Sequence, residues 1–385
     1  MPIYLDNSTI TRPSEKAVSR MFAFLTDTWG SSIAPHRMGQ ELYHSLEESY
    51  KALYALLGAK KEDTLVFTSS GAEAINQVFI SVYLEETRNK GKNQYIVSQT
   101  DEAPIQMSVS RLQQMGCVGK YIKPDALGKI SVEAIADAIT PRTALVSLSW
   151  ANGLTGVINP VADIAHLCKS RGIKLHLDAT HVLGKLYYDL ADIDADFISF
   201  NGSHLHAPQG TGGLWIKAGV SCTPLIIGSA EQAGYRAGNI NMPAFVAMGH
   251  AAREALETRD LFCMETARLR DRLERGIAQG WPEATVLFKD SDRLPHCCTL
   301  TFPGIANEAL LFALSRQELF GSIGGGSFPQ LSLILQASDI PPILAHTALS
   351  VSLSRETLEE EIDRATYLII ETARRLRRLS TQLPI

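Results

Sequence analysis

The chain has 385 residues, of which 45% are hydrophobic and 20% are charged, and its formal net charge is −5 at pH 7. This length predicts more than one domain, and the composition is that of a globular protein. The negative balance argues against a nucleic-acid partner, and no apolar run is long enough to cross a membrane. A basic run at 374–379 continues a helical apolar pattern, which indicates the solvated face of a terminal helix.

The start of the chain and its cysteines predict the cellular compartment. Met1-Pro2-Ile3 runs directly into YLD, without the charged and apolar segments of a signal peptide. The six cysteines have no spacing typical of a disulfide framework, and Cys297 and Cys298 are adjacent on a predicted strand, where their side chains point to opposite faces. We therefore expect a cytoplasmic protein with reduced thiols.

In chain order, short apolar runs alternate with amphipathic helical patterns through the first two thirds of the sequence. The apolar runs predict strands at 64–67, 95–98, 144–149, 173–178, 197–200 and 213–217. The patterns between and after them predict helices at 71–86, 104–115, 131–139, 160–171 and 242–256. This alternation predicts an α/β fold with a mostly parallel sheet between two layers of helices.

After about residue 256 the pattern changes to a smaller α+β unit. It contains predicted helices at 264–278, 306–318 and 357–379, with short strands near 296–302 and 347–353. The helical stretch across 242–278 is expected to bridge the two units.

Polar residues follow several predicted strands at the point where each strand ends. Ser70-Gly71-Ala72 opens a helix, Asn152 follows 144–149, and Asp178 ends 173–178. Open α/β sheets bind ligands at this edge, and a helix start favours a phosphate or a carboxylate. Taken alone, the helix start is better explained by ordinary capping with Glu73 as a capping-box partner, whereas for Asp178 capping and ligand binding weigh about evenly. The convergence of these residues on one edge predicts a pocket.

The segment 197–214, FISFNGSHLHAPQGTGGL, breaks a strand into a polar loop at the same edge. Strand-to-loop breaks of this kind commonly carry chemistry in α/β proteins. This loop holds no lysine, cysteine or acid, only Ser203, His204 and His206.

Seven motifs together resemble the bacterial cysteine desulfurases, which belong to the class V aminotransferase branch of fold-type-I pyridoxal phosphate (PLP) enzymes. In order, they are YLDNSTITRP, FTSSGAEAIN, LVSLSWANGLTGVINPV, LHLDATHVLGKL, the loop segment above, RAGNINMPAFVAMG and SLSRETLEEEID. The resemblance implies a large PLP-type domain at 15–255 and a small domain formed by 1–14 and 256–385. It also implies a homodimer with its pockets near the interface.

The same resemblance implies cofactor contacts for several residues. Asp178 matches the carboxylate that keeps the pyridine nitrogen protonated. Asn152 and His181 match positions at the phenolic oxygen of the ring. Ser70, Gly71 and Ala72 match the phosphate loop, with Ala72 in place of a threonine, and Arg236 in YRAGN is a remaining cation.

The reactive positions of the family carry other residues in this chain. The family loop Ser-Gly-His-Lys reads Asn201-Gly202-Ser203-His204 here, so His204 replaces the Schiff-base lysine and Ser203 a phosphate-binding histidine. Three further positions differ: the ring-stacking histidine is Glu102, the sulfur-accepting cysteine is Ser327, and the substrate arginine is Ser350. Arg355, the second arginine of that motif, remains, whereas Lys185 and Lys217 lie outside the lysine motif.

These replacements change the expected chemistry. Imidazole cannot form an aldimine, and a serine hydroxyl cannot carry a persulfide. Glu102 and Asp178 would repel a phosphate group, whose charge is about −1.5 to −2. PLP is implied by the family, but we expect it to bind weakly and non-covalently, or not at all.

Three functions therefore stay open. The first is a pseudoenzyme, a desulfurase-like dimer that binds a small anionic ligand or a protein partner without lysine chemistry. The second is an enzyme using PLP or its amine form (PMP) with His204 as the base, as in the deoxysugar dehydratases of the superfamily. The third is a metal site at His181, His204 and His206, because histidines spaced i, i+2 on an extended loop face the same side.

Overall fold

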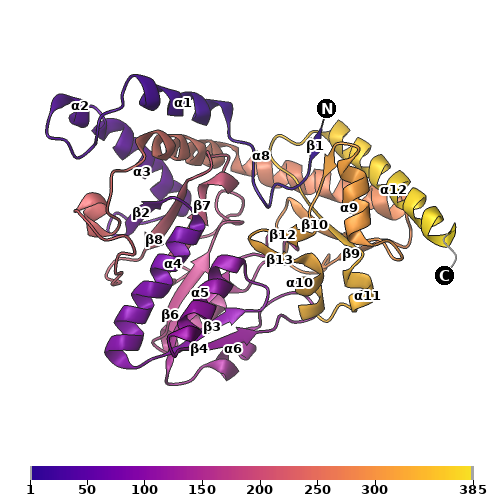
Figure 1. Cartoon of the computed structure of the whole chain (residues 1–385), viewed down its shortest axis with the longest axis horizontal. Helices are drawn as coiled ribbons and strands as arrows, with labels where there is room; N and C mark the ends of the chain where they lie inside the picture. The colour runs from indigo at the N-terminus through magenta and orange to yellow at the C-terminus, as the bar shows by residue number, and fades with distance from the viewer. Residues whose placement is uncertain (1, 383–385) are drawn as a thin grey trace.

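The computed structural model describes residues 2–382, and a seven-stranded sheet forms the centre of the larger part of the molecule (Figure 1). The strand order is β2 (Thr64–Thr68), β8 (Gly212–Ile216), β7 (Phe197–Asn201), β6 (Lys174–Asp178), β5 (Thr143–Ser149), β3 (Gln94–Ser98) and β4 (Val118–Ile122). Only β8 runs antiparallel to its neighbours. The prediction of a mostly parallel sheet is thus confirmed.

Helices cover both faces of this sheet, because its central strands are apolar on both sides. One face packs against α4 (Gly71–Val82) and α5 (Ala103–Gln114). The other packs against α3 (Tyr43–Leu57), α6 (Val132–Ala138), α7 (Val161–Ser170) and the first half of α8 (Met242–Gly280). Strand β3 illustrates the alternation, since Tyr95 and Val97 lie in the first layer and Ile96 lies in the second.

A second, smaller core surrounds the later half of α8. There the antiparallel strands β14 (Ala348–Ser352), β10 (Cys297–Thr301) and β9 (Thr285–Leu287) pack with α8, α9 (Asn307–Ser315) and α12 (Glu359–Gln382) (Figure 1). Cys297 and Cys298 lie in different hydrophobic clusters, as their opposite orientation on a strand requires. The single long helix confirms the predicted bridge across 242–278.

The N-terminal residues join the smaller unit. Strand β1 (Ile3–Tyr4) pairs in parallel with β11 (Leu319–Phe320), and α1 (Glu15–Thr26) then leads back toward α3 and α8. The short elements α2 (Arg37–Gln40), β12 (Gly324–Gly325), β13 (Phe328–Gln330), α10 (Leu331–Ala337) and α11 (Pro342–Ala345) complete the chain, with a π-helical turn at Tyr83–Arg88 and a 3-10 turn at Glu231–Gly234. The expected small-domain range includes residue 1 and residues 383–385, which lie outside the described residues.

No helix within residues 2–382 combines the length and apolar character needed to cross a membrane.

Candidate functional site

A cavity of about 200 Å³ opens at the carboxyl edge of the seven-stranded sheet, and we call it the aspartate cavity after Asp178. It brings together most of the candidate residues taken from the sequence: Ser70, Gly71, Ala72, Glu102, Asp178, Asn201, His204 and Ser327. The other candidates do not line it: Asn152, His181, Ser203, Arg236 and Ser350. The predicted convergence on one sheet edge is therefore observed for the first group.

Asp178 is the last residue of β6 and only 5% of its surface is exposed. Its Oδ1 accepts hydrogen bonds from the hydroxyl of Thr180 at 2.7 Å and from the Thr180 amide at 3.1 Å. Burial, helped by the nearby charge of Glu102, raises the pKa of Asp178 to about 6. The turn after β6 therefore orients this carboxylate, and the nearby His181 acts against the rise in its pKa.

Glu102 and His181 form a bonded pair on one wall of the site. His181 donates from Nε2 to Glu102 Oε1 at 2.6 Å, and its ring meets His204 edge-on with the ring centroids 5.1 Å apart. The His181 ring packs directly against the backbone of Gly153, because a Cβ atom at residue 153 would lie 2.4 Å from His181 Cε1. Glu102 is thus a hydrogen-bond acceptor at the position where the resemblance expects a stacking histidine.

His204 ends the short 3-10 helix η2 (Gly202–His204) that follows β7. Its Nε2 lies 2.8 Å from the carbonyl oxygen of Ser8, and because a carbonyl only accepts, Nε2 carries the proton. Burial is the main cause that lowers the pKa of His204 well below its usual value. The side chain is a neutral imidazole tied to the N-terminal segment.

That N-terminal segment holds the whole loop after β7. Thr11 donates to the carbonyl of Ser203 from its amide at 3.0 Å and from its hydroxyl at 2.7 Å. The hydroxyl of Thr11 also accepts the amide of His206 at 2.9 Å, and His206 Nδ1 donates to the carbonyl of Arg12 at 2.8 Å. The loop after β7 is thus held in place by hydrogen bonds to the N-terminal segment, which is far away in the sequence.

The hypothesis of a metal site at His181, His204 and His206 is wrong. The loop is not extended, because His204 lies in a 3-10 turn and His206 adopts a φ of 62°. One ring nitrogen of each of these two histidines is used by a backbone carbonyl. Within residues 2–382, no three His, Cys, Asp or Glu side chains gather as a metal ion would require.

The start of α4 is capped as the alternative interpretation of the sequence expects. Ser70 Oγ accepts the amide of Glu73 at 3.2 Å, and the carboxylate of Glu73 accepts the amide of Ser69 at 2.8 Å. Arg236 donates from Nε to the same carboxylate at 3.0 Å. The amides of the first helical turn still lack intrahelical acceptors. Arg236, the cation predicted for this site, is instead paired with Glu73 and does not line the cavity.

The remaining candidates serve different purposes. Ser327 is exposed on the β12–β13 turn at the cavity rim, and its carbonyl accepts the amide of Ala103 at 2.7 Å. Ser350 is buried on β14, where its hydroxyl donates to the carbonyl of Leu154 at 2.7 Å. Asn152 Oδ1 accepts the amide of Leu154 at 3.0 Å. Ser350 and Asn152 therefore fix the turn around Leu154 and do not line the aspartate cavity.

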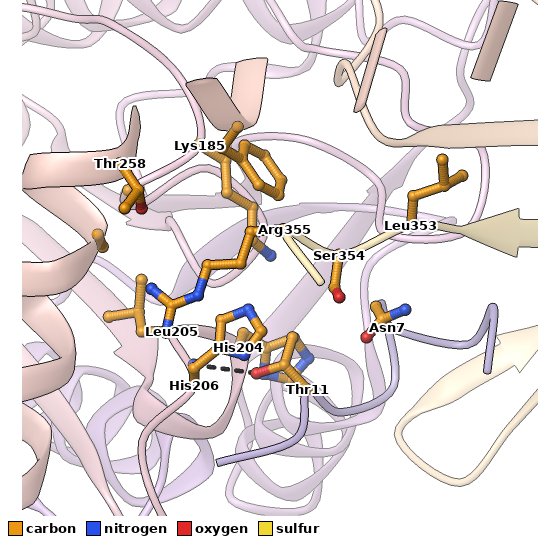
Figure 2. Close-up of a pocket in the computed structure, with 13 residues that line it drawn as sticks. Asn7, Thr11, Lys185, His204, Leu205, His206, Thr258, Leu353, Ser354 and Arg355 are labelled. Atoms are coloured by element: carbon orange, nitrogen blue, oxygen red, sulfur yellow. Dashed lines mark hydrogen bonds between the residues drawn. The ribbon is translucent and has the colours of Figure 1, made fainter. Parts of the chain in front are cut away.

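A second, smaller cavity of about 20 Å³ shares His204 with the aspartate cavity, and we call it the lysine cavity (Figure 2). Lys185, Arg355 and His206 line it, and His204 forms the wall that it shares with the aspartate cavity. Lys185 is 6% exposed, and its Nζ has no hydrogen-bond partner. The sequence analysis did not predict Lys185 as a site residue. Its only sequence signal is that a lysine stands within the apolar stretch VLGKL.

Both the sequence and the fold resemble known proteins. The profile of the family described as aminotransferase class-V matches residues 3–364. A cysteine desulfurase of Bradyrhizobium diazoefficiens is 33% identical over 380 residues, which cover 98% of this chain and 95% of the relative. Cysteine desulfurase NifS of Azotobacter vinelandii is 32% identical over 383 residues, covering 98% and 94%. A solved NifS-like protein has a TM-score of 0.89 at 27% identity, covering 98% of this chain and 99% of its own.

Proposed function

The chain belongs to the class-V aminotransferase family and is a homologue of the cysteine desulfurases, and we propose that it is a ligand-binding member that has lost lysine-dependent catalysis. Its fold is that of the fold-type-I PLP enzymes, as the resemblance predicted. The observation that carries the proposal is the lining of the aspartate cavity, which contains neither an amine nor a thiol. His204 occupies the place of the lysine, and its Nε2 is engaged by Ser8.

PLP is the cofactor expected for this family, but the residues of the aspartate cavity do not fit its usual covalent form. The lining includes the carboxylates of Glu102 and Asp178 and no lysine or arginine. For a phosphate of about −1.5 to −2 charge, the lining offers the amides at the start of α4 and the neutral side-chain donors of residues such as Thr9 and Asn201, without a lysine or arginine. We therefore propose weak, non-covalent binding of PLP.

A second candidate is PLP- or PMP-dependent chemistry with His204 as the base. The retained Asp178 favours it, because a buried carboxylate at the end of β6 suits a protonated ring nitrogen. The environment of His204 disfavours it, since burial lowers the pKa of this imidazole and its Nε2 is already bonded. A base needs a pKa near the working pH, so non-catalytic binding is the better-supported function.

We also propose that the protein acts as a cytoplasmic homodimer, with domains at 15–255 and at 1–14 plus 256–385. Support for association comes from exposed apolar side chains that gather along one N-terminal stretch: Phe22, Leu25, Trp29 and Ile33. Support for the division comes from the separate hydrophobic clusters around the two sheets. Sedimentation of the purified chain tests the dimer, and a monomer at micromolar concentration would contradict it.

The function is tested by adding PLP to the purified protein. We expect the absorption spectrum to keep the free-aldehyde band, and gel filtration to remove the cofactor. Incubation with cysteine should release no sulfide. An aldimine band that survives gel filtration, or sulfide above the level without protein, would refute the proposal.

A further inference from the structure

We propose that the aspartate cavity selects ligands that carry both an anionic group and a protonated amine, so that it binds the amine form PMP in preference to an equivalent ligand without the amine. This inference rests on the proposed function, because a cavity with lysine chemistry would supply the amine itself. The residue that carries the selectivity is Glu102, which lines the cavity together with Asp178.

The lining contains two carboxylates and lacks an amine that would balance them. Glu102 and Asp178 both line the cavity, whereas no lysine or arginine of the described chain does. Thr180 occupies only Oδ1 of Asp178, so Oδ2 is the oxygen left for a ligand. His204 does not replace the missing charge, because burial lowers the pKa of its imidazole.

The bonded histidine leaves this negative charge in excess. His181 donates to Oε1 of Glu102 at 2.6 Å, so the second oxygen, Oε2, stays free of that bond. Even a protonated His181 supplies one positive charge against two carboxylates. A ligand that brings its own ammonium group balances the remaining charge, whereas a neutral ligand leaves it uncompensated.

The same histidine places Glu102 beside the position that we assign to the lost lysine. The ring of His181 meets the ring of His204 edge-on, with 5.1 Å between the centroids, and its Nε2 bonds Glu102. Glu102 and His204 therefore flank one ring, and both line the cavity. A ligand amine next to His204 would meet a carboxylate at a point where the chain itself offers no amine.

The preference for an anionic group comes from the start of α4. Gly71 and Ala72 line the cavity, and the amides in the first turn of a helix lack acceptors within the helix. Together with the positive end of the helix dipole, these amides favour a phosphate or a carboxylate. The cavity therefore offers donors to an anion and carboxylates to an amine, which is the complement of a zwitterion.

Two ligands that differ only in the amine test this selectivity. Pyridoxamine 5′-phosphate (PMP) and pyridoxine 5′-phosphate share the ring and the phosphate, but the first carries an ammonium group where the second carries a hydroxyl. Calorimetric titration of the full chain at pH 8 measures both affinities. We expect PMP to bind at least about tenfold more tightly. Equal affinities, or no binding of either ligand at millimolar concentration, would overturn the proposal.

The variant Glu102→Gln tests whether the preference comes from this side chain. It keeps an acceptor for His181 but removes the charge, so the ratio of the two affinities should fall to within about threefold. The ratio isolates the amine, because weaker repulsion of the phosphate acts on both ligands alike. Glu133→Gln, at an exposed position of α6, should keep the wild-type ratio. An unchanged ratio in Glu102→Gln would overturn the role of Glu102.

Crystals of the wild type soaked in PMP give a readout that needs no variant. We expect the amine to lie within hydrogen-bonding distance of a carboxylate oxygen of Glu102. An amine directed away from Glu102 would overturn the proposal.

The affinity ratio is separable from the test of the proposed function. Sulfide release and the absorption spectrum with PLP report lysine chemistry, and they use neither of these two ligands. A wild type that releases no sulfide but fails to prefer PMP would refute the selectivity alone. Sulfide release would refute the proposed function whatever the ratio.

Discussion

His204 Nε2 and the carbonyl oxygen of Ser8 lie 2.8 Å apart, although 196 residues separate them in the chain. The bond joins the N-terminal segment to the loop after β7, and it uses the one ring nitrogen that carries a proton. From the motif resemblance we infer that this is the position of the family's reactive lysine. The same residue lines two cavities of opposite character, one that contains carboxylates and another that contains Lys185 and Arg355.

The clamp made by the N-terminal segment should contribute measurably to stability. Thr11→Val keeps the shape of the side chain but removes the hydroxyl that bonds Ser203 and His206. Because the amide of His206 then loses its acceptor, we expect a loss of about 1–3 kcal/mol in the free energy of unfolding, measured with urea. The exposed Thr26→Val serves as a control and should change it by less than about 0.5 kcal/mol. Equal effects of both substitutions would show that the clamp does not stabilise the fold.

Stability should fall as Asp178 ionises. The pKa of Asp178 is raised to about 6 in the folded chain from an ordinary value of 3.8. Between these values the unfolded chain releases the proton first, so this group destabilises the fold progressively as pH rises from about 4 to about 6, and by a constant amount above that. Asp178→Asn should therefore be more stable than the wild type at pH 8, by about 2–3 kcal/mol at most, with no advantage below pH 4.

Urea unfolding at pH 4, 6 and 8 measures this difference. Asp137→Asn, at an exposed position of α6, is the matched control. Asp178→Asn showing no gain at pH 8 would mean that a cation or solvent already compensates the carboxylate.

Glu102 should set the affinity of the aspartate cavity for anions. Glu102→Gln removes one of the two carboxylates in the lining and keeps an acceptor for His181. With less repulsion of the phosphate, PLP should bind about tenfold more tightly, equivalent to about 1.4 kcal/mol. Fluorescence titration with PLP measures the affinity, and Glu133→Gln on the exposed side of α6 should leave it unchanged. A weaker affinity in Glu102→Gln would instead assign Glu102 a positive role in binding.

Local patterns predicted the large sheet well because each strand carries its own signal. Strand β5 is buried along its whole length and β6 from Leu175 onward, so composition alone reveals them. Strand β4 was missing from the prediction because VGKYI lies at a sheet edge and exposes Val118 and Lys120. Helix α3 was also missing, although its apolar spacing and the left-handed Gly58 at its end are helix signals.

The site was less predictable because it depends on contacts between distant residues. Motif positions predicted Asp178 and His204 as site residues, and both line one cavity, but nothing in the local sequence reveals that Ser8 and Thr11 hold the loop of His204. The metal hypothesis failed for the same reason, since the spacing of His204 and His206 was read as extended chain and the clamp imposes a turn. The unpaired amine of Lys185 has no sequence signature beyond its apolar neighbours.

Restoring the lysine should not restore desulfurase activity. His204→Lys removes the hydrogen bond from the imidazole to the Ser8 carbonyl, which lowers the free energy of unfolding by about 0.5–1.5 kcal/mol. Ser327 still offers a hydroxyl, which cannot accept sulfur. We expect no sulfide from cysteine with His204→Lys or with Ser327→Cys alone, nor with the exposed control His166→Lys. Sulfide should first appear when both changes are combined with Ser350→Arg, which supplies the missing charge for the substrate carboxylate. Sulfide release by His204→Lys alone would show that the pocket kept the remaining machinery, and the assignment of Ser327 to the sulfur-accepting position would then be wrong.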